Sequence, residues 1–571
     1  MNSNFIAEST FIKDINSNNS IDARDNTRPS IKQGIDIQVN REKRKELQIS
    51  LRKKTKEEGL FKRRRQFTVS SSIHDTNNNT SVTDIGQGLN LAEITDALFQ
   101  PHGKFPDSIV QGLNSSDFST VERALHIFYD FSKHAANTTI IQKLVESQIV
   151  PRLVQCMTAI QDVEIQNLAG CCLSNIGLGD EHHVRYLISC NVIPAFIELY
   201  KTNHPELWEI ATWGLGNIAG ENASSRDLVL QHGALINILQ LCVPQAKPKL
   251  LDVATWCLSN FTRHNPRPNF GLLCNAIPTL ENLLGSQNLE VIHNTCNAIQ
   301  HLTEDESENN AKLDYVCTKF PNLLGKVVHI LKDSLSLNST ASLCKSIQLA
   351  TIKICGNFAV GNERHCRLLS DLNVVPLLLH SLSNTRDFNV RKYICWCFSN
   401  IAADATEQLQ VMISTQGLFP QLIQIAIDDK FDVSKEAMWT ICNAVGTAND
   451  SQMEELLSQK ILTAICYSLA QRVCAQTTHT VLKSIHTILK YGKRNSIFHH
   501  EPYNRICEDV EQLGGLTELE LLQTHELGEI SSLCRTILEE FFEPDEIAMI
   551  TDNVVNNNPN IQSNNNNIFT F

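Results

Sequence analysis

An indole and a carboxamide four residues apart recur along this chain, and no other feature restricts its fold as strongly. Residues at positions i and i+4 share one face of a helix, although Asn is a poor helix former. One such pair would most often be ordinary helix core. Four of the five tryptophans follow the pattern, however, as Trp213/Asn217, Trp256/Asn260, Trp396/Asn400 and Trp439/Asn443. The pattern therefore indicates a structural repeat.

The spacing of the asparagines gives the length of the repeat. Forty-three residues separate Asn217 from Asn260, and the same number separates Asn400 from Asn443. Asn175 lies 42 residues before Asn217. A helical period near this length is typical of armadillo and HEAT repeats, in which each unit buries its apolar face against its neighbours.

The repeat continues between the first two Trp/Asn pairs and the last two. His301 follows Asn260 by 41 residues, and Asn357 follows His301 by 56. The longer step implies an insertion, which we place at residues 332–343. Each unit also has Pro near a helix start, then a polar turn, then the helix that carries Asn. With no long period-2 runs, the sequence predicts an all-α, armadillo-repeat, right-handed superhelical solenoid of about ten repeats over residues 89–550.

Composition agrees with this fold and excludes several classes of protein. A solenoid grows by adding units, so 571 residues need no single core. The 19 cysteines include no CxxC pair and lie in apolar helical stretches, which predicts reduced, buried thiols. The pairs His182/His183 and His499/His500 lack Cys partners at ligand spacing, so we expect no metal and no other cofactor. No apolar run is long enough to span a bilayer, and the first residues do not resemble a signal peptide, so we expect no membrane association.

Charge is divided unevenly along the chain. Residues 41–65 contain twelve Lys or Arg and four Glu, a net charge of +8, whereas the whole chain carries −13. The remainder therefore carries −21. Polar, low-complexity sequence flanks the basic segment, which predicts a disordered start at 1–40, a basic arm at 41–67 and a flexible linker at 68–88. Residues 551–571 include nine Asn and are expected to form a disordered tail.

The repeat and the charge together predict a peptide-binding groove. If the last helix of each unit lines the groove, the asparagines form a ladder of carboxamides, which can both donate to and accept from the main chain of an extended peptide. Parallel indoles would form slots for the aliphatic stems of Lys or Arg, with cation–π attraction to the charged head. Glu221 and Glu436 lie close in sequence to these pairs and would favour cations. The expected ligand is an extended, Lys/Arg-rich peptide.

At this point the chain resembles a known family. The arm, "QISLRKKTKEEGLFKRRRQF", is similar to the importin-β-binding domain of importin-α, and the WxxxN units resemble that family's armadillo repeats. The resemblance covers residues 41 to about 550. It implies an adaptor that binds nuclear localisation signals of cargo proteins, links them to importin-β, and shuttles between cytoplasm and nucleus. It also implies that the free arm folds back into the chain's own groove. The basic residues concerned are Arg52, Lys53, Lys54, Lys62, Arg63, Arg64 and Arg65.

The resemblance also assigns two cargo sites. The major site would use Asn175, Trp213, Asn217, Glu221, Trp256 and Asn260, and the minor site Asn357, Trp396, Asn400, Glu436, Trp439 and Asn443. By the same resemblance, the acidic helix end in "LEEFFEPDEIAMI" implies contact with an export receptor together with Ran-GTP; the alternative is an ordinary polar cap on the last repeat.

Several positions depart from the family pattern. Cys171 stands at the first Trp position of the major site, Val184 stands where the family has Thr, and Glu221 replaces Asp. Asn297 stands where the family often has Trp. We expect a shallower first site. At mid-groove, His301 stands where the family has an aromatic residue and Lys353 where it has Arg. A cation there should repel a cationic ligand, which suits the linker of a bipartite signal.

Three other functions remain open at this stage. A nucleic-acid binder could use the basic arm, but a body of −21 would repel a duplex, so we expect no direct nucleic-acid contact. A catenin-like scaffold would need a basic groove, whereas the body of this chain is acidic. A divergent importin-α-like scaffold dedicated to one partner is the third, and the losses at Cys171 and Asn297 favour it. No phosphate loop, nucleophile elbow or Cys/His pair in a defined context occurs, so no catalytic site and no enzyme are expected.

Overall fold

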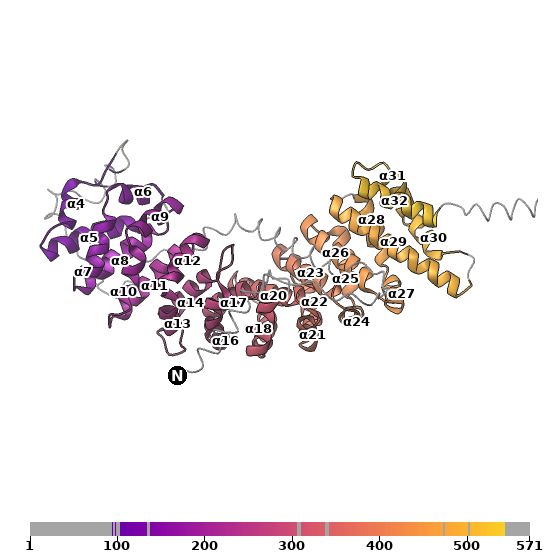
Figure 1. Cartoon of the computed structure of the whole chain (residues 1–571), viewed down its shortest axis with the longest axis horizontal. Helices are drawn as coiled ribbons and strands as arrows, with labels where there is room; N and C mark the ends of the chain where they lie inside the picture. The colour runs from indigo at the N-terminus through magenta and orange to yellow at the C-terminus, as the bar shows by residue number, and fades with distance from the viewer. Residues whose placement is uncertain are drawn as a thin grey trace, which may run out of the picture. The chain divides into compact units, whose positions relative to one another are not determined.

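The computed structural model describes residues 94, 98, 103–133, 138–304, 310–336, 342–471, 474–500 and 503–542. Within these ranges the chain is helical and forms no strand, as Figure 1 shows. The described residues divide into two compact units, one reaching to Gly361 and one beginning at Asn362. None of the described helices is both long and apolar enough to cross a bilayer.

The first unit opens with two helices and continues as five repeats, each built from three main helices. The opening pair is α4 (Asp107–Leu113) and α5 (Phe118–Ser132). The repeats are α6 (Thr138–Glu146), α7 (Val150–Ala159) and α8 (Val163–Ile176); α9 (Glu181–Ser189), α10 (Val192–Leu199) and α11 (Pro205–Ala219); α12 (Ala223–Gln231), α13 (Ala234–Leu241) and α14 (Pro248–Phe261); α15 (Phe270–Leu273), extended by the 3-10 turn η1 (Cys274–Ala276), α16 (Ile277–Leu283) and α17 (Leu289–Thr303); and α18 (Ala311–Lys319), α19 (Leu323–Ser336) and α20 (Ser342–Val360).

The second unit has four repeats of the same plan within its described residues. They are α21 (Glu363–Asp371), α22 (Val374–Asn384) and α23 (Phe388–Ala402); α24 (Thr406–Ser414), α25 (Leu418–Asp428) and α26 (Phe431–Thr447); α27 (Asp450–Ser458), α28 (Ile461–Gln471) and α29 (Ala475–Phe498); and α30 (Arg505–Gln512), α31 (Gly515–Leu522) and α32 (Gly528–Phe541). The all-α armadillo architecture predicted from the spacing is confirmed.

Left-handed residues mark the turn between the first and second helices of most repeats. Asn191, Gly233, Asn373, Gly417 and Gly514 all have positive φ and immediately precede the second helix of their repeat. Gly adopts this conformation without a Cβ clash, and Asn tolerates it better than most residues. In these five repeats the turn is made by Gly or Asn, whereas Gln148 and Lys460 take the left-handed conformation before α7 and α28.

The long step in the register is taken up mainly by longer helices. The second helix α19 has 14 residues and the third helix α20 has 19, whereas α13 and α14 have 8 and 14. Residues 337–341, inside the insertion expected at 332–343, lie outside the described residues. The connection from α17 to α18 is also longer than that from α11 to α12.

The third helices form the centre of each unit. In the first unit α5, α8, α11, α14, α17 and α20 pack one on the next, and in the second unit α23, α26, α29 and α32 do the same. All 19 cysteines are free thiols, and 15 of them are buried. Burial raises the pKa of thiols such as Cys242 and Cys355 to about 12. These are the reduced, inert thiols that the sequence predicts.

A side-chain hydrogen bond joins several of the third helices to the one before them. Asn217 Nδ2 donates to the Ser174 carbonyl at 3.0 Å, and Asn260 Nδ2 donates to the Gly216 carbonyl at 3.0 Å. The same bond recurs from Asn443 to Ser399 at 2.9 Å and from Asn357 to Gln300 at 2.9 Å. In every case the acceptor is the residue just before Asn175, Asn217, Asn400 or His301, which stand at the equivalent position in the preceding repeat. The asparagines thus link neighbouring repeats.

A buried arginine makes a second link between repeats. Arg226 on α12 is fully buried, and its guanidinium donates to the carbonyls of Arg263, of His264 at 3.3 Å and of Pro266 at 3.0 Å, besides pairing with Asp227. Its five N–H donors satisfy carbonyls of a connection that would otherwise lack regular partners. Arg226 therefore fixes the connection between α14 and α15.

Replacing a linking asparagine should cost stability. We expect Asn217→Ala to lower the free energy of unfolding by about 1–3 kcal/mol, because the buried Ser174 carbonyl loses its donor. Urea denaturation followed by circular dichroism would measure the loss. Hydrogen exchange should show it as faster exchange in α8 and α11. The control is Asn495→Ala, an exposed Asn on α29, and an equal loss in the control would contradict the linking role.

Candidate functional site

The structure places the residues assigned to the major site on three consecutive third helices. Asn175 lies on α8, Trp213 and Asn217 on α11, and Trp256 and Asn260 on α14. Since these helices pack in that order, the pairs line one side of the first unit. The asparagines are buried, and each carboxamide uses one N–H for the bond to the preceding repeat; for Asn175 the acceptor is Ser132 Oγ at 3.0 Å.

The two indoles of this run touch each other. The ring centroids of Trp213 and Trp256 are 5.2 Å apart, with 44° between the ring planes. The sequence interpretation expected parallel indoles with a gap between them, and this arrangement differs: the rings are tilted and in contact, which leaves no space for a side-chain stem between them. Trp213 is half-buried and Trp256 is buried. A ligand side chain would therefore lie against the outer face of this aromatic pair.

A glycine makes room for the second indole. A Cβ atom at Gly216 would lie 2.3 Å from Cζ3 of Trp256, which is far inside contact distance. Gly216 is one helical turn after Trp213 and also supplies the carbonyl that Asn260 binds. The absence of a side chain at this position thus lets Trp256 lie flat on α11 beside Trp213.

The residues of the second run lie on α23 and α26 of the second unit. Trp396 and Trp439 are buried, and Tyr393 packs edge-on against Trp396 at 6.0 Å. Asn443 Nδ2 donates to both the carbonyl and the Oγ of Ser399. Asn400 Nδ2 donates instead to the Trp396 carbonyl in its own helix at 3.0 Å. The indole Nε1 atoms of Trp396 and Trp439 have no hydrogen-bond acceptor among the described residues.

The two candidate carboxylates have different surroundings. Glu221 is half-buried just after the end of α11. Glu436 lies on α26 three residues before Trp439, and only 1% of its surface is exposed. Burial raises the pKa of Glu436 to about 7, with the nearby Lys392 and Lys435 opposing that rise and Asp432 adding to it. Lys392 is itself paired with Asp432 at 3.1 Å.

The departures at the first site are both buried in the repeat core. Cys171 is buried, and its thiol donates to Asn167 Oδ1 at 3.3 Å within α8. Burial raises the pKa of Cys171 well above its usual value. Val184 on α9 is also buried. At the position where the resemblance implies an indole, this chain has a small thiol that is bonded within its own helix.

Cationic side chains gather where the register has no tryptophan. His301 on α17 is half-buried, and its Nδ1 lies 3.0 Å from Thr262 Oγ1. Burial, followed by the charges of Arg267, Arg263, Lys353 and His264, holds the pKa of His301 well below its usual value. The imidazole is therefore neutral at pH 7, among three permanently charged groups.

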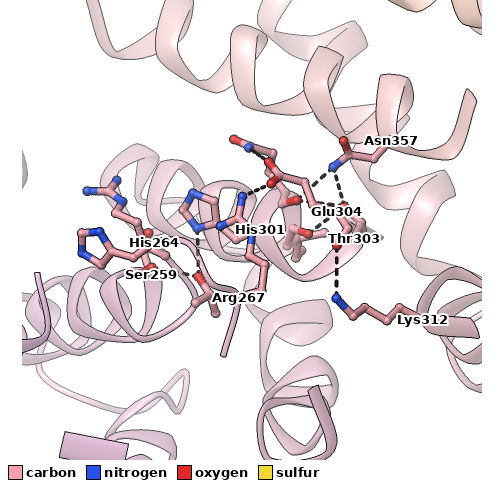
Figure 2. Close-up of polar contacts among 12 residues, drawn as sticks. Ser259, His264, Arg267, His301, Thr303, Glu304, Lys312 and Asn357 are labelled. Atoms are coloured by element: carbon pink, nitrogen blue, oxygen red, sulfur yellow. Dashed lines mark hydrogen bonds and ion pairs between the residues drawn. The ribbon is translucent and has the colours of Figure 1, made fainter. Parts of the chain in front are cut away.

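One carboxylate offsets part of this charge, as Figure 2 shows. Glu304 forms an ion pair with Arg267, accepts a hydrogen bond from Gln300 Nε2 at 2.6 Å, and offers its carbonyl to Lys312 at 3.4 Å. Asn357, which the resemblance assigns to the minor site, belongs to the first unit, where it donates to Gln300 and to Thr303 Oγ1 at 3.0 Å. Asn297 Nδ2 lies 3.0 Å from His293 Nε2 in its own helix. The stretch from α14 to α20 thus has cations where the two runs have indoles.

Sequence reasoning identified Lys353 but missed Arg263 and Arg267. Both lie in "TRHNPRPN", directly after Asn260, and the two prolines mark a connection that leaves the helix. Their position next to His301 depends on Arg226, which binds that connection from the preceding repeat. No local pattern indicates such a contact, because it joins residues about 40 positions apart.

The histidine pair near the first site has a structural role. Asp180, His182 and His183 can bring one ligand atom each within 4.8 Å of one another. The Nδ1 of His183, however, accepts from the Asp180 main-chain N–H in a capping box, and its Nε2 lies 2.8 Å from Gln142 Oε1. The Nδ1 therefore caps the start of α9, and the Nε2 joins α9 to α6 of the preceding repeat. The basic arm, from Arg52 to Arg65, lies outside the described residues.

Comparison with family models gives matches to three kinds of domain. A model of the importin beta binding domain matches residues 30–126. A model of the armadillo/beta-catenin-like repeat matches residues 137–177, 180–220 and 362–403, and a model of an atypical Arm repeat matches residues 504–557. A crystal structure of an engineered protein has the same fold, with a TM-score of 0.65, 18% identity, and coverage of 77% of this chain and 99% of that one.

Curated relatives have one name in common. Importin subunit alpha-1a of Oryza sativa subsp. japonica is 27% identical over 519 residues, covering 90% of this chain and 91% of that protein. Importin subunit alpha-3 of Arabidopsis thaliana is 28% identical over 515 residues, covering 90% of this chain and 91% of the relative. Such proteins are non-enzymatic adaptors. An importin beta binding model and armadillo-repeat models match the same chain, and its curated relatives are importin alpha subunits, so the chain matches the importin-α family.

Proposed function

We propose that this protein is a nuclear import adaptor, which binds Lys/Arg-rich nuclear localisation signals and links their cargo to importin-β. The observation that carries the proposal is the recurrence of Trp and Asn on packed third helices of an acidic body, in a chain whose residues 30–126 match the importin-β-binding model. In this proposal residues 41–67 bind importin-β, residues 68–88 tether them, and the repeats over 89–550 bind cargo.

The Asn and Trp side chains of the two runs would recognise different parts of the peptide. The carboxamides at the register positions would hold the peptide main chain, since amides donate and accept without regard to the peptide's side chains. The indoles would contact the stems of Lys or Arg and attract their charged heads, at about 0.5–2 kcal/mol for each cation–π contact. With Trp213 tilted against Trp256, such a stem would lie on the outer face of the pair.

The cations between α14 and α20 would separate two basic clusters of a bipartite signal. Arg263, Arg267 and Lys353 would repel a third cationic cluster at this point, and Arg267 is ion-paired with Glu304. A linker that is neutral or acidic fits this stretch. The two runs of tryptophans would then bind the two clusters.

A second candidate is an importin-α-like scaffold dedicated to one partner. The observation that favours it is Cys171, whose buried thiol is bonded to Asn167 where the family has an indole. Such a change removes one stacking surface from the major site. In either case the protein would shuttle between cytoplasm and nucleus, and its last repeat would contact an export receptor together with Ran-GTP.

Peptide binding should depend on the tryptophans in register. The chain lacking residues 1–75 is expected to bind a bipartite basic peptide, with affinity that falls as salt rises. Trp256→Ala and Trp439→Ala should each weaken binding by about 2- to 30-fold, the equivalent of one cation–π contact. Fluorescence anisotropy would measure the change.

The matched control for this measurement is Trp208→Ala. Trp208 is the fifth tryptophan and lies on α11, the same helix as Trp213. It does not stand four residues before an Asn, and its Nε1 donates to the Thr202 carbonyl at 2.9 Å. Its removal should leave affinity unchanged. Equal binding of the basic peptide and an alanine-substituted peptide would contradict the adaptor proposal.

Binding at the second run should vary with pH around neutrality. Glu436 has a pKa of about 7, so its carboxylate gains charge, and attracts a cationic peptide more strongly, as pH rises from 6 to 8. Because the folded-state pKa lies above the unfolded value, the same ionisation lowers stability as pH rises through 7.

Glu436→Gln should therefore remove this pH dependence and weaken binding at pH 8, while raising stability there. Calorimetry with a single-cluster peptide and thermal unfolding, each at pH 6 and 8, would test both signs. A variant that loses stability at pH 8 would contradict this assignment.

The basic arm should compete with cargo in the full-length chain. A linker of roughly 20 residues after Arg65 reaches on the order of 25 Å, and tethering raises the local concentration of the arm towards millimolar values. Replacing Lys62, Arg63 and Arg64 by Ala should therefore tighten binding of a cargo peptide. Addition of importin-β to the wild-type chain should produce a similar gain by withdrawing the arm. Equal affinities in all three samples would mean that the arm recruits the carrier without gating the cargo site.

A further inference from the structure

Large apolar side chains are exposed together where α29 ends. Phe498 is 79% exposed and Ile497 is 68% exposed, at the last two residues of that helix, and Tyr503 before α30 is 53% exposed. We call these three residues the C-terminal patch. The exposed fractions of Phe498 and Ile497 are higher than those of the other exposed large apolar side chains among the described residues. Surface aromatic and aliphatic side chains grouped in this way indicate a docking surface.

The chain leaves its last described helix beside this patch. Phe541, the final residue of α32, has its ring 5.5 Å from Lys493 Nζ and 5.8 Å from the His486 ring, both on α29. Lys493 also donates to the Glu540 carbonyl at 3.3 Å, and Cys507 donates to the Phe541 carbonyl. Ile497 lies one helical turn beyond Lys493 on the same face of α29. The segment after Phe542 therefore starts roughly one helical turn from the patch, about 5–6 Å along α29.

Charge near the patch is positive. Lys490, Lys493 and Arg494 are exposed on the last turns of α29, where Arg494 pairs with Asp450 at 2.8 Å, and two exposed histidines, His499 and His500, follow. Hydrogen bonding from His486 and the charges of Lys490 and Lys493 hold the pKa of Glu540 below its usual value, against the effect of its burial. An acidic segment entering this region would be attracted in the same way.

The residues that follow α32 fit this surface in charge and in apolarity. Residues 543–555 read "EPDEIAMITDNVV", with three carboxylates in the first four positions and then Ile547, Met549 and Ile550. They lie outside the described residues, but the atypical Arm repeat model that matches from residue 504 continues to residue 557. The family's last repeat thus includes a stretch beyond α32.

We propose that residues 543–555 fold back onto the C-terminal patch, with the carboxylates beside Lys490 and Lys493 and the apolar residues against Ile497, Phe498 and Tyr503. The five residues from Phe542 to Ile547 span up to about 16–18 Å when extended, which exceeds the separation of one helical turn. Docking would cover the exposed side chains and extend the last repeat. This inference does not depend on the proposed import function.

Photo-crosslinking in the full-length chain tests the contact. Phe498→p-benzoylphenylalanine, which keeps an aromatic side chain at the patch, should form crosslinks within one chain to residues 543–557, identified by peptide mass spectrometry. The matched position is Phe118→p-benzoylphenylalanine in the first unit, which is 57% exposed and should give no crosslink to that segment. Covalent dimers from position 498 would mean that a second copy covers the patch, and would overturn the proposal. Absence of any crosslink to 543–557 would overturn it as well.

Substitutions in the segment separate docking from chance proximity. Ile547→Asp with Ile550→Asp should lower the crosslink yield from position 498 at least fivefold. Ile561→Asp with Ile568→Asp, which makes the same chemical change further along the chain, should leave the yield unchanged. Equal yields from both double variants would contradict the proposed contact. Since no helix of the described repeats is altered, loss of folding does not confuse the result.

Discussion

The hydrogen bond from a side-chain amide to the main chain of the preceding repeat sets the geometry on which the rest of this structure depends. Asn217, Asn260, Asn357 and Asn443 each donate to the carbonyl one residue before the previous register position. Since these four donors meet their acceptors at 2.9–3.0 Å, each bond ties a third helix to the preceding one at an equivalent position. Any side chain four residues before an Asn is then presented in the same direction in each repeat. The row of indoles follows from the row of amides.

This arrangement lets one chain combine two kinds of surface. Where the register carries Trp, as at Trp213 and Trp256, apolar rings lie beside carboxamides and attract cations through their faces. Around His301, Lys353 stands at a position that holds Trp in the two runs, and Arg263 and Arg267 from the connection after α14 lie near the neutral imidazole. The helices are alike in the two stretches, so the difference in preference comes from the side chains alone. An armadillo repeat can therefore change its selectivity without changing its fold.

The repeat could be predicted from the sequence because its signal is periodic. The spacing of Asn175, Asn217 and Asn260 fixed both the helix that carries the site and the order of packing. The features of the candidate site that could not be predicted from the sequence depend on contacts between residues far apart in the chain. The tilt of Trp256 depends on the missing Cβ of Gly216 on another helix, and the place of Arg267 depends on Arg226 about 40 residues earlier. The burial that raises the pKa of Glu436 likewise comes from packing that no local pattern records.

The guanidinium of Arg226 limits how freely such a protein can be shortened or recombined. Its partners, the carbonyls of Arg263, His264 and Pro266, all belong to the next repeat's entry, so neither repeat is complete without the other. A chain cut after Asn260 would remove these carbonyl acceptors and leave Asp227 to pair with a fully buried guanidinium, and buried N–H donors that lose their acceptors are strongly destabilising. Duplication or loss of units in evolution would therefore have to keep this pair of repeats as one block, although its neighbours could be exchanged singly.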